Sequence, residues 1–221
     1  MRPSARRSAP SGRGVRVGLP AAILLVALAL RLHRLGGANL WWDEALAVWG
    51  VRQGLAGVTL WTAADVHPPL YFWSLWAWVQ LAGESEFALR ALSALVGVLT
   101  VAVVYRLGAR VAGWRVGALA ALLTATARFH VWWSQEARMY ALAGLLGMLS
   151  LDLFLRWLDA ERAPDGRPGR PLRLYVLATA GALYTIFLMG ALLVVQNLVV
   201  AAALVHRRPG RRAMVGRWAL A

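Results

Sequence analysis

The apolar residues of this chain are gathered into blocks whose length matches the thickness of a lipid bilayer. The longest block, residues 174–205, runs for 32 residues without a charge. At about 1.5 Å per residue it would form a helix of ~48 Å, too long for one ordinary span, so we expect it to divide near Gly190 into two short spans. Because 60% of all residues are hydrophobic and only 15% are charged, we predict an all-α fold, a polytopic membrane helix bundle.

The positive charge is distributed as in a membrane protein rather than as in a nucleic-acid-binding protein. The formal net charge is +14, and all 24 basic residues are arginine. They are concentrated in the N-terminal tail and between the apolar blocks, where the positive-inside rule puts them in the cytoplasm. We therefore exclude nucleic acid as a partner. The chain has no cysteine, which excludes disulfides, thiolate catalysis and cysteine-based zinc sites.

The chain divides into three predicted regions. Residues 1–16 are rich in Arg, Ser, Pro and Gly and are expected to be a disordered cytoplasmic tail. Residues 17–206 form a transmembrane module of about six spans. Residues 207–221 are a basic cytoplasmic segment, at which we expect the chain to be truncated. The spans are predicted at residues 17–35, 87–106, 113–131 and 139–158, followed by the two halves of 174–205. The first apolar stretch is long and has no clean cleavage site, so we interpret it as an uncleaved span.

The segment 68–83, with sequence PPLYFWSLWAWVQLAG, decides the topology. It is short and rich in interfacial aromatic residues, so we predict a surface helix within an outer loop of residues 36–86. If it does not cross the membrane, every later basic cluster falls on the side of the N-terminal tail. The clusters are Arg106 with Arg110 and Arg115, Arg156 to Arg173, and Arg207 to Arg217. Six of the ten acidic residues then lie outside: Asp43, Glu44, Asp65, Glu84, Glu86 and Glu136.

The sequence WWDEA at residues 41–45 puts two adjacent carboxylates after two tryptophans, just outside the first span. A carboxylate at the edge of a low-dielectric wall can act as a general base. Asp43 and Glu44 are therefore candidate catalytic residues. The structural alternative is an ordinary helix start, where acidic residues are favoured in the first turn.

A charge at the outer end of an apolar span is costly, which makes Arg90 a candidate functional residue. Its natural partner would be an anion such as a lipid phosphate, bound through two N–H groups. The alternatives are snorkelling or an ion pair with Glu86, four residues earlier.

Two further segments supply candidate cavity-lining residues. In DVHPPLYF the double proline fixes the entry into the surface helix, and His67 and Tyr71 flank it. His67 could equally be an ordinary polar loop residue. The outer turn WWSQEARMYAL holds a dense polar set that suggests a lined cavity, the alternative being an interfacial turn. The set comprises Gln135, Glu136, Arg138 and Tyr140.

Other polar residues receive structural interpretations. Arg31 and Arg34 lie near the outer end of the first span, where their side chains can snorkel. Asp152 and Arg156 are spaced i, i+4 and are expected to pair. The remaining histidines lie near span ends and are interpreted as ordinary polar residues: His33, His130 and His206.

Taken in order and spacing, four motifs resemble the N-terminal module of the polytopic GT-C glycosyltransferases. They are LWWDEA, HPPLYF, FALRALSALVGVLTVAVVYRLGARVAG and SQEARMYAL. The closest group contains the dolichyl-phosphate-mannose–protein mannosyltransferases and the lipid A aminoarabinose transferases, a glycosyltransferase family 39-like group. The resemblance covers roughly residues 20–205. It implies surface helices in the first outer loop, in agreement with the charge distribution.

The resemblance also implies roles for individual residues. Asp43 and Glu44 match a pair that supplies the catalytic carboxylate, and Asp43 is the stronger candidate. Arg90 matches an arginine implicated in binding the donor phosphate, and we assign Arg138 to the same phosphate. Residues 135–140 match a loop that borders the cavity.

The implied reaction moves a sugar from a polyprenyl-phosphate donor to a glycan, lipid or protein acceptor at the extracytoplasmic face, with inversion. No cofactor is certain, and a divalent metal stays open. Relatives often have a histidine in the stretch where this chain has Ile186 and Phe187, and they are usually about twice as long. The alternatives are a transporter or a non-catalytic scaffold for a lipid-linked anion.

Overall fold

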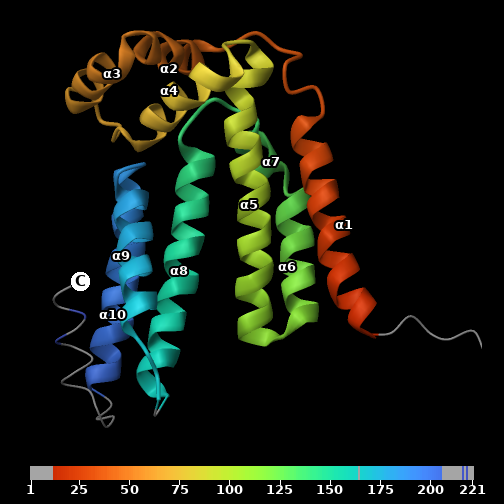
Figure 1. Cartoon of the computed structure of the whole chain (residues 1–221), viewed down its shortest axis with the longest axis vertical. Coiled ribbons are helices and arrows are strands. Elements are labelled where there is room, and N and C mark those ends of the chain that lie inside the picture. Colours follow the sequence, from red (N-terminus) through yellow and green to blue (C-terminus); the bar gives the residue numbers. More distant parts are fainter. Residues whose placement is uncertain (1–11, 164, 206–215, 217, 219–221) are drawn as a thin grey trace, which may run out of the picture.

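The computed structural model describes residues 12–163, 165–205, 216 and 218, and all regular structure in these residues is helical. The helices α1, α5, α6, α8, α9 and α10 run along the long axis, whereas α2, α3 and α4 gather at one end, which we name the capped end (Figure 1). The elements are α1 (Gly12–Leu32), α2 (Trp42–Arg52), α3 (Gly54–Ala63), α4 (Leu70–Ala82), α5 (Glu86–Ala112), α6 (Trp114–Thr126), α7 (Arg128–Ser134), α8 (Tyr140–Arg162), α9 (Gly169–Leu183), the 3-10 helix η1 (Phe187–Met189) and α10 (Gly190–Val205).

The helix α5 is the centre of the bundle and packs against α1, α6, α8 and the cap helix α4. Its turn into α6 is at Gly113, whose φ of +87° is readily adopted only by glycine. Gly108 on α5 faces Gly117 on α6 so closely that a Cβ at Gly108 would lie 2.9 Å from the Gly117 Cα. The absence of side chains here lets the α5 and α6 backbones run in contact.

The cap has an apolar core that it shares with the start of α5 and with the segment before α8. Tyr71, Phe72 and Leu75 on α4 are buried against Val58 on α3 and Ala47 on α2. The double proline ends just before α4, and the Leu70 amide donates to the Tyr184 carbonyl at the end of α9. The cap is therefore a packed unit that rests on the bundle.

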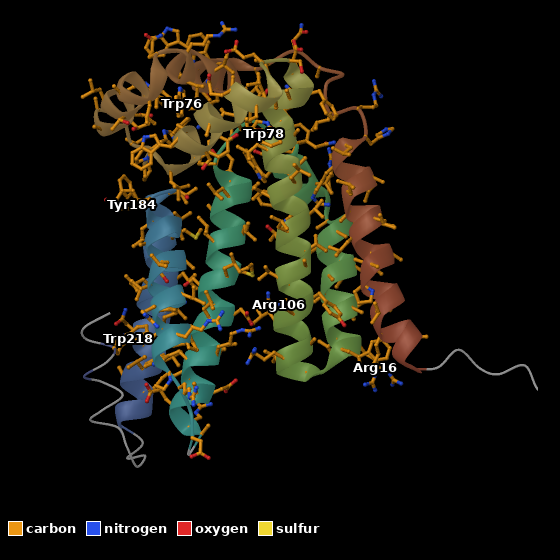
Figure 2. All side chains as sticks on the ribbon, in the orientation of Figure 1. Arg16, Trp76, Trp78, Arg106, Tyr184 and Trp218 are labelled. Atoms are coloured by element: carbon orange, nitrogen blue, oxygen red, sulfur yellow. The ribbon has the colours of Figure 1, made fainter. Side chains whose placement is uncertain are left out.

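A buried carboxylate organises the opposite end of the bundle. Asp152 on α8 is 1% exposed and accepts hydrogen bonds from Arg106 and Arg110 of α5 and from Arg156 of its own helix, the last at 2.8 Å. The predicted pair of Asp152 and Arg156 is confirmed as part of this larger cluster. Figure 2 shows Arg16 and Arg106 towards this end and Trp76 and Trp78 at the capped end.

Three helices are long and apolar enough to cross a membrane: Gly14–Leu32 within α1, together with α5 and α8. The shorter apolar helices include α6 and a stretch through η1 and α10. The outward faces are apolar, for example Leu25 on α1, which is 67% exposed. Such faces are those expected of helices in contact with lipid.

The predicted helices occur in the expected order, but the structure also has α2, α3 and α7, and several boundaries needed correction. The first span begins at Gly12 rather than residue 17, so the end of the expected disordered tail is helical, while residues 1–11 lie outside the described residues. The span 113–131 is in fact two helices separated at Ala127. The predicted division near Gly190 is confirmed. His206 and almost all of residues 207–221 also lie outside the described residues.

Candidate active site

Glu44 accepts hydrogen bonds from several segments that meet at the capped end. It lies in the first turn of α2 and is fully buried. Its Oε1 accepts from Arg90 Nε and from the Ala137 amide, both at 2.8 Å, and its Oε2 accepts from Arg90 Nη2 at 2.6 Å and from the Trp41 amide at 3.4 Å. One carboxylate thus joins the start of α2, α5 and the segment before α8.

Arg90 is held entirely by protein groups. Besides Glu44, its guanidinium donates to the carbonyls of Leu35 at 3.1 Å, Ala38 at 2.8 Å and Asn39 at 3.1 Å. A guanidinium has five N–H groups, and all five are used by these three carbonyls and the carboxylate. The ion-pair partner of Arg90 is therefore Glu44, not Glu86. Through the three carbonyls, Arg90 also holds the segment that follows α1.

Asp43 points to a different arginine. Its side chain is 36% exposed, and Oδ2 lies 3.5 Å from Arg138 Nη2. Arg138 is 5% exposed; it also donates from Nη1 to the Asp43 carbonyl at 3.3 Å, and its Nε has no hydrogen-bond partner among the described residues. Arg138 is thus a nearly buried cation whose Nη contacts are long and which lies beside a partly exposed carboxylate.

His67 links Arg138 to a second carboxylate. His67 Nδ1 lies 2.9 Å from Asp65 Oδ2, and Nε2 lies 3.5 Å from Arg138 Nη2. Since arginine can only donate, Nε2 is the acceptor and the proton of the ring is on Nδ1, which donates to Asp65. Partial burial alone would raise the pKa of Asp65, but hydrogen bonds from His67 and the Val66 amide lower it below its ordinary value.

Tyr71 and Ser93 are linked by hydrogen bonds to the backbone of Arg138. The Tyr71 hydroxyl lies 3.2 Å from Ser93 Oγ, which is 3.4 Å from the Arg138 carbonyl. Burial raises the pKa of Tyr71, so its hydroxyl stays protonated as a hydrogen-bond donor. Tyr71 is thus a buried support, not a wall of an open cavity.

The two polar residues that follow α7 line a cavity of about 650 Å³, together with Glu44 and Arg90. Gln135 Nε2 lies 3.0 Å from the His33 carbonyl and also reaches the carbonyls of Leu30 and Arg31, which end α1. Glu136 is 9% exposed, and burial raises the pKa of its carboxyl above its ordinary value. Asp43, His67 and Arg138 are not among the lining residues of this cavity.

Tyr140 lies at the start of α8 and packs against Trp133 with ring centroids 4.1 Å apart. It borders a second, mostly apolar cavity of about 340 Å³ between α7, α8 and η1. The structure thus divides the predicted site residues into two groups. Asp43, His67 and Arg138 form one, and Glu44, Arg90, Gln135 and Glu136 form the other; Tyr71 and Tyr140 flank them.

Sequence reasoning missed a buried cluster around Arg31. Arg31 is not a snorkelling residue, because it is fully buried and donates to the carbonyls of Ala27, Thr124 and Ala125, to Ser134 Oγ and to His130 Nδ1, the last at 2.6 Å. The two α6 carbonyls belong to its C-terminal turn, which favours a cation. The signal that could have found it is an arginine and a histidine facing each other across two predicted spans.

Sequence reasoning also missed Asp65 and Ser93 as partners of site residues. Asp65 is two residues from His67, a spacing that a turn can bring into contact, whereas Ser93 gave no signal. Within the described residues no group of three or more histidine, cysteine, aspartate or glutamate side chains is arranged to hold a metal ion.

An all-helical bundle with membrane-length helices and a charged network under a cap of short helices defines a polytopic membrane protein. The chain belongs to the dolichyl-phosphate-mannose-protein mannosyltransferase family, whose family model matches residues 66–219. No curated protein and no solved structure matches the chain. The matched range includes His67, Arg90 and the 135–140 segment and begins after Asp43 and Glu44. Membership of this family implies a glycosyltransferase that uses a lipid-linked sugar.

Proposed function

We propose that this protein transfers a sugar from a polyprenyl-phosphate donor to an acceptor hydroxyl, with Asp43 as the general base. The observation that carries the proposal is the 3.5 Å contact between Asp43 Oδ2 and Arg138 Nη2. Displacement at an anomeric carbon needs a base on the acceptor side and a cation at the leaving phosphate. Asp43 and Arg138 supply both groups in one place, and Asp43 is the more exposed of the two carboxylates.

We assign the donor phosphate to Arg138 rather than to Arg90. Every N–H group of Arg90 has a protein acceptor, whereas Arg138 Nε has none and the other contacts of Arg138 are long, at 3.3–3.5 Å. Because Nε is itself buried, a phosphate would bind the Nη groups, whose present contacts are long. Arg90 is then a positioning residue: through Glu44 it holds the Ala137 amide, directly before Arg138.

The reaction follows from these roles. The donor phosphate pairs with Arg138 and displaces the carboxylate of Asp43, which moves to the face of the sugar opposite the phosphate and is there free to accept a proton. Asp43 takes the proton of the acceptor hydroxyl as its oxygen forms a bond to the anomeric carbon. The bond from that carbon to the phosphate oxygen breaks, and the electron pair leaves on the phosphate against Arg138. A single displacement of this kind inverts the anomeric configuration.

We propose that the capped end faces the extracytoplasmic side of the cell membrane and that the N-terminus is cytoplasmic. The arginines around Asp152, and also Arg167, which lies between α8 and α9, are at the opposite end of the bundle, in support of this orientation. In this proposal α4 is the surface helix, and the six spans are α1, α5, α6 with α7, α8, α9 and α10, of which α1, α5 and α8 have the length and apolar character of a span. The donor lipid would then lie in the outer leaflet.

The test is sugar transfer by the full chain in proteoliposomes that contain radiolabelled polyprenyl-phosphate mannose, glucose or arabinose and membrane extract as acceptor. Asp43→Asn is expected to lower the transfer rate by about 100-fold or more, the usual size of a lost general base. Asp159→Asn is the matched control, because Asp159 forms an exposed ion pair at the opposite end, and it should transfer at the wild-type rate. Transfer by Asp43→Asn at the wild-type rate would remove Asp43 from the mechanism.

A transporter of a lipid-linked anion is the alternative function, and Arg31, the buried arginine of the first span, gives it no support. Arg31 has five N–H groups, and each has a protein acceptor, so none is left for a lipid-linked anion. A scaffold that only binds such an anion would lose no function with Asp43→Asn. The same transfer assay therefore separates these functions.

A further inference from the structure

Three arginine side chains gather around one buried carboxylate at the end of the bundle opposite the cap. Arg106 and Arg110 extend from α5 and Arg156 extends from α8, and all three pair with Asp152, whose side chain is 1% exposed. Arg110 also donates to Asp159, at 3.0 Å. We name Arg106, Arg110 and Arg156 the α5–α8 arginine cluster. Nothing in the proposed transfer step uses it.

Most N–H groups of the α5–α8 arginine cluster have no protein acceptor. A guanidinium has five N–H groups. Arg106 uses one of them, from Nη2 to Asp152 at 3.3 Å, and Arg156 uses one, from Nε to Asp152 at 2.8 Å. Arg110 uses two, and within the described part of the chain no further side chain or carbonyl accepts from these three arginines. Asp152 therefore holds the arginines together and leaves their outer N–H groups for another anion.

The ion pairs at this end of the bundle contain more cations than anions. Asp159 is shared, because its other carboxylate oxygen lies 3.9 Å from Nη1 of Arg162. Asp152 and Asp159 thus serve the three arginines of the cluster and Arg162 as well. Positive charge without a counter-ion is costly at the edge of a membrane, since it is neither paired nor fully hydrated there. A further anion would remove this cost.

Arg106 lies at the depth where the phosphates of a lipid leaflet are expected. Between Glu86, at the start of α5, and Arg106 the helix rises by ~30 Å, at about 1.5 Å per residue. This rise equals the thickness of the hydrocarbon core, which is about 30 Å. Figure 2 shows Arg106 towards the end opposite the cap. Its side chain is 52% exposed, so its guanidinium can reach the head groups of the leaflet at that end.

The face of α5 that carries Arg106 continues towards the cap as an exposed apolar strip. Leu99 and Leu95 precede Arg106 by about two and three helical turns, which puts all three on one face of the helix. The two leucines are 55% and 42% exposed. A cationic group at the membrane edge followed by apolar side chains towards the membrane centre matches a phospholipid, which has a phosphate above an acyl chain.

We infer that the α5–α8 arginine cluster binds an anionic phospholipid. The phosphodiester pairs with Arg106 and Arg156, because a planar guanidinium can give a phosphate two parallel hydrogen bonds. The acyl chain lies along Leu95 and Leu99. A lipid with a net negative charge compensates the excess of arginine, whereas a zwitterionic lipid brings a cation of its own. The proposed orientation puts this lipid in the cytoplasmic leaflet, opposite the donor lipid, but the site itself does not depend on the proposed function.

Native mass spectrometry of the full chain, freed of lipid in a neutral detergent, measures the binding. The probes are phosphatidylglycerol and phosphatidylcholine with the same acyl chains. The wild type should bind one phosphatidylglycerol at least about 5-fold more tightly than phosphatidylcholine, the size expected for one arginine at an anionic lipid surface. Arg106→Gln should remove this preference. Arg173→Gln is the matched control, because Arg173 is an exposed arginine of α9 at the same end and bonds only the Gly169 carbonyl, and it should keep the preference.

A second variant leaves every arginine in place and keeps the test decisive if Arg106→Gln does not fold. Leu99→Gln should weaken the binding of phosphatidylglycerol by about 3-fold or more, since apolar contact with the acyl chain is lost. Leu119→Gln is its control, because Leu119 on α6 is 56% exposed and lies outside the strip. It should bind phosphatidylglycerol as the wild type does.

Competition distinguishes the possible sources of the phosphate. Phosphatidylglycerol should stay bound in the presence of inorganic phosphate or of an equal concentration of polyprenyl phosphate. Displacement by inorganic phosphate would assign the cluster to a free anion, and displacement by polyprenyl phosphate would assign it to the donor lipid. Either result overturns the inference.

The inference also fails if the two phospholipids bind equally well, or if Arg173→Gln weakens binding as much as Arg106→Gln does. The second result would show an effect of the charge of the whole end rather than a site. Asp43→Asn separates the inference from the proposed function, because this variant should lose sugar transfer and keep the preference for phosphatidylglycerol.

Discussion

The carboxylate of Glu44 and the guanidinium of Arg90 form a doubly hydrogen-bonded ion pair, with Nε 2.8 Å from Oε1 and Nη2 2.6 Å from Oε2. Both side chains are removed from solvent, at 0% and 7% exposed. The pair joins segments 46 residues apart, and the same carboxylate holds the amide of Ala137. The adjacent acids of the WWDEA motif thus have different tasks, because the first turn of α2 directs Glu44 inward and leaves Asp43 at the surface.

The first prediction concerns this pair. Glu44→Gln leaves the guanidinium buried without its counter-ion, and breaking a buried pair in this way costs about 3–5 kcal/mol. Arg90→Lys keeps the charge but loses the planar fork, so it should also destabilise the chain. Thermal unfolding in detergent, followed by size-exclusion fluorescence, measures both. Glu84→Gln is the matched control, because Glu84 pairs with Arg52 at the same end in an exposed position, and it should leave the unfolding temperature unchanged. Equal unfolding temperatures for the wild type and Glu44→Gln would contradict the structural role.

The orientation in the membrane is open to a direct test, since the chain has no native cysteine. Gln53→Cys puts a single thiol on the exposed surface of the cap, and Arg167→Cys puts one in the turn between α8 and α9 at the other end. A membrane-impermeant maleimide should label Gln53→Cys on intact cells and Arg167→Cys only after permeabilisation. The reverse pattern would invert the topology and with it the proposed side of transfer.

The order of the long helices could be predicted from the sequence, because the length of each apolar block and the positions of the arginines can be read from the sequence alone. The 32 uncharged residues of 174–205 had to divide, and the chain breaks just before Gly190. The break at Ala127 was not predicted, although Arg128 follows it directly. In the last turn before the break, the carbonyls of Thr124 and Ala125 accept from Arg31 of another helix, a contact that the local sequence does not show.

The partners of the site residues were less predictable than their identity. The sequence singled out Arg90, Glu44 and Arg138 as unusual charges. The nearest acid in sequence to Arg90 is Glu86, but the structure pairs Arg90 with Glu44, 46 residues away. Spacing rules describe one helix at a time, whereas a guanidinium with five donors collects acceptors from every segment in reach. The phosphate roles of Arg90 and Arg138 stay predictions, although every N–H group of Arg90 has a protein acceptor and Arg138 Nε has none.

The third prediction tests the close approach of α5 to α7 and α1. A Cβ at Gly97 would lie 2.7 Å from Ser134 Cβ and 2.9 Å from Arg31 Nε, so Gly97→Ala must displace the buried Arg31 cluster. Overpacking of this kind costs about 1–3 kcal/mol. Gly144→Ala on α8 is the control, because a Cβ at Gly144 would have no neighbouring atom within 4 Å and alanine is the better helix former. Gly97→Ala should unfold at a lower temperature than the wild type and Gly144→Ala at the same or a higher one. The packing argument is wrong if the order is reversed.

The last prediction concerns the pH dependence of stability. Burial raises the pKa of the Glu136 carboxyl in the folded chain above its ordinary value, although a hydrogen bond from Trp132 opposes the shift. A raised folded pKa means that the protonated form is favoured on folding. The contribution of Glu136 to the free energy of unfolding is therefore fully present below its unfolded pKa and is lost as the pH rises through its folded pKa. Glu136→Gln cannot ionise and lacks this loss. The unfolding temperature of Glu136→Gln minus that of the wild type, measured from pH 4 to pH 8, should increase with pH and level off above the folded pKa. A difference that is flat across this range, or that falls as the pH rises, would show that the carboxyl has found a cationic partner in solution.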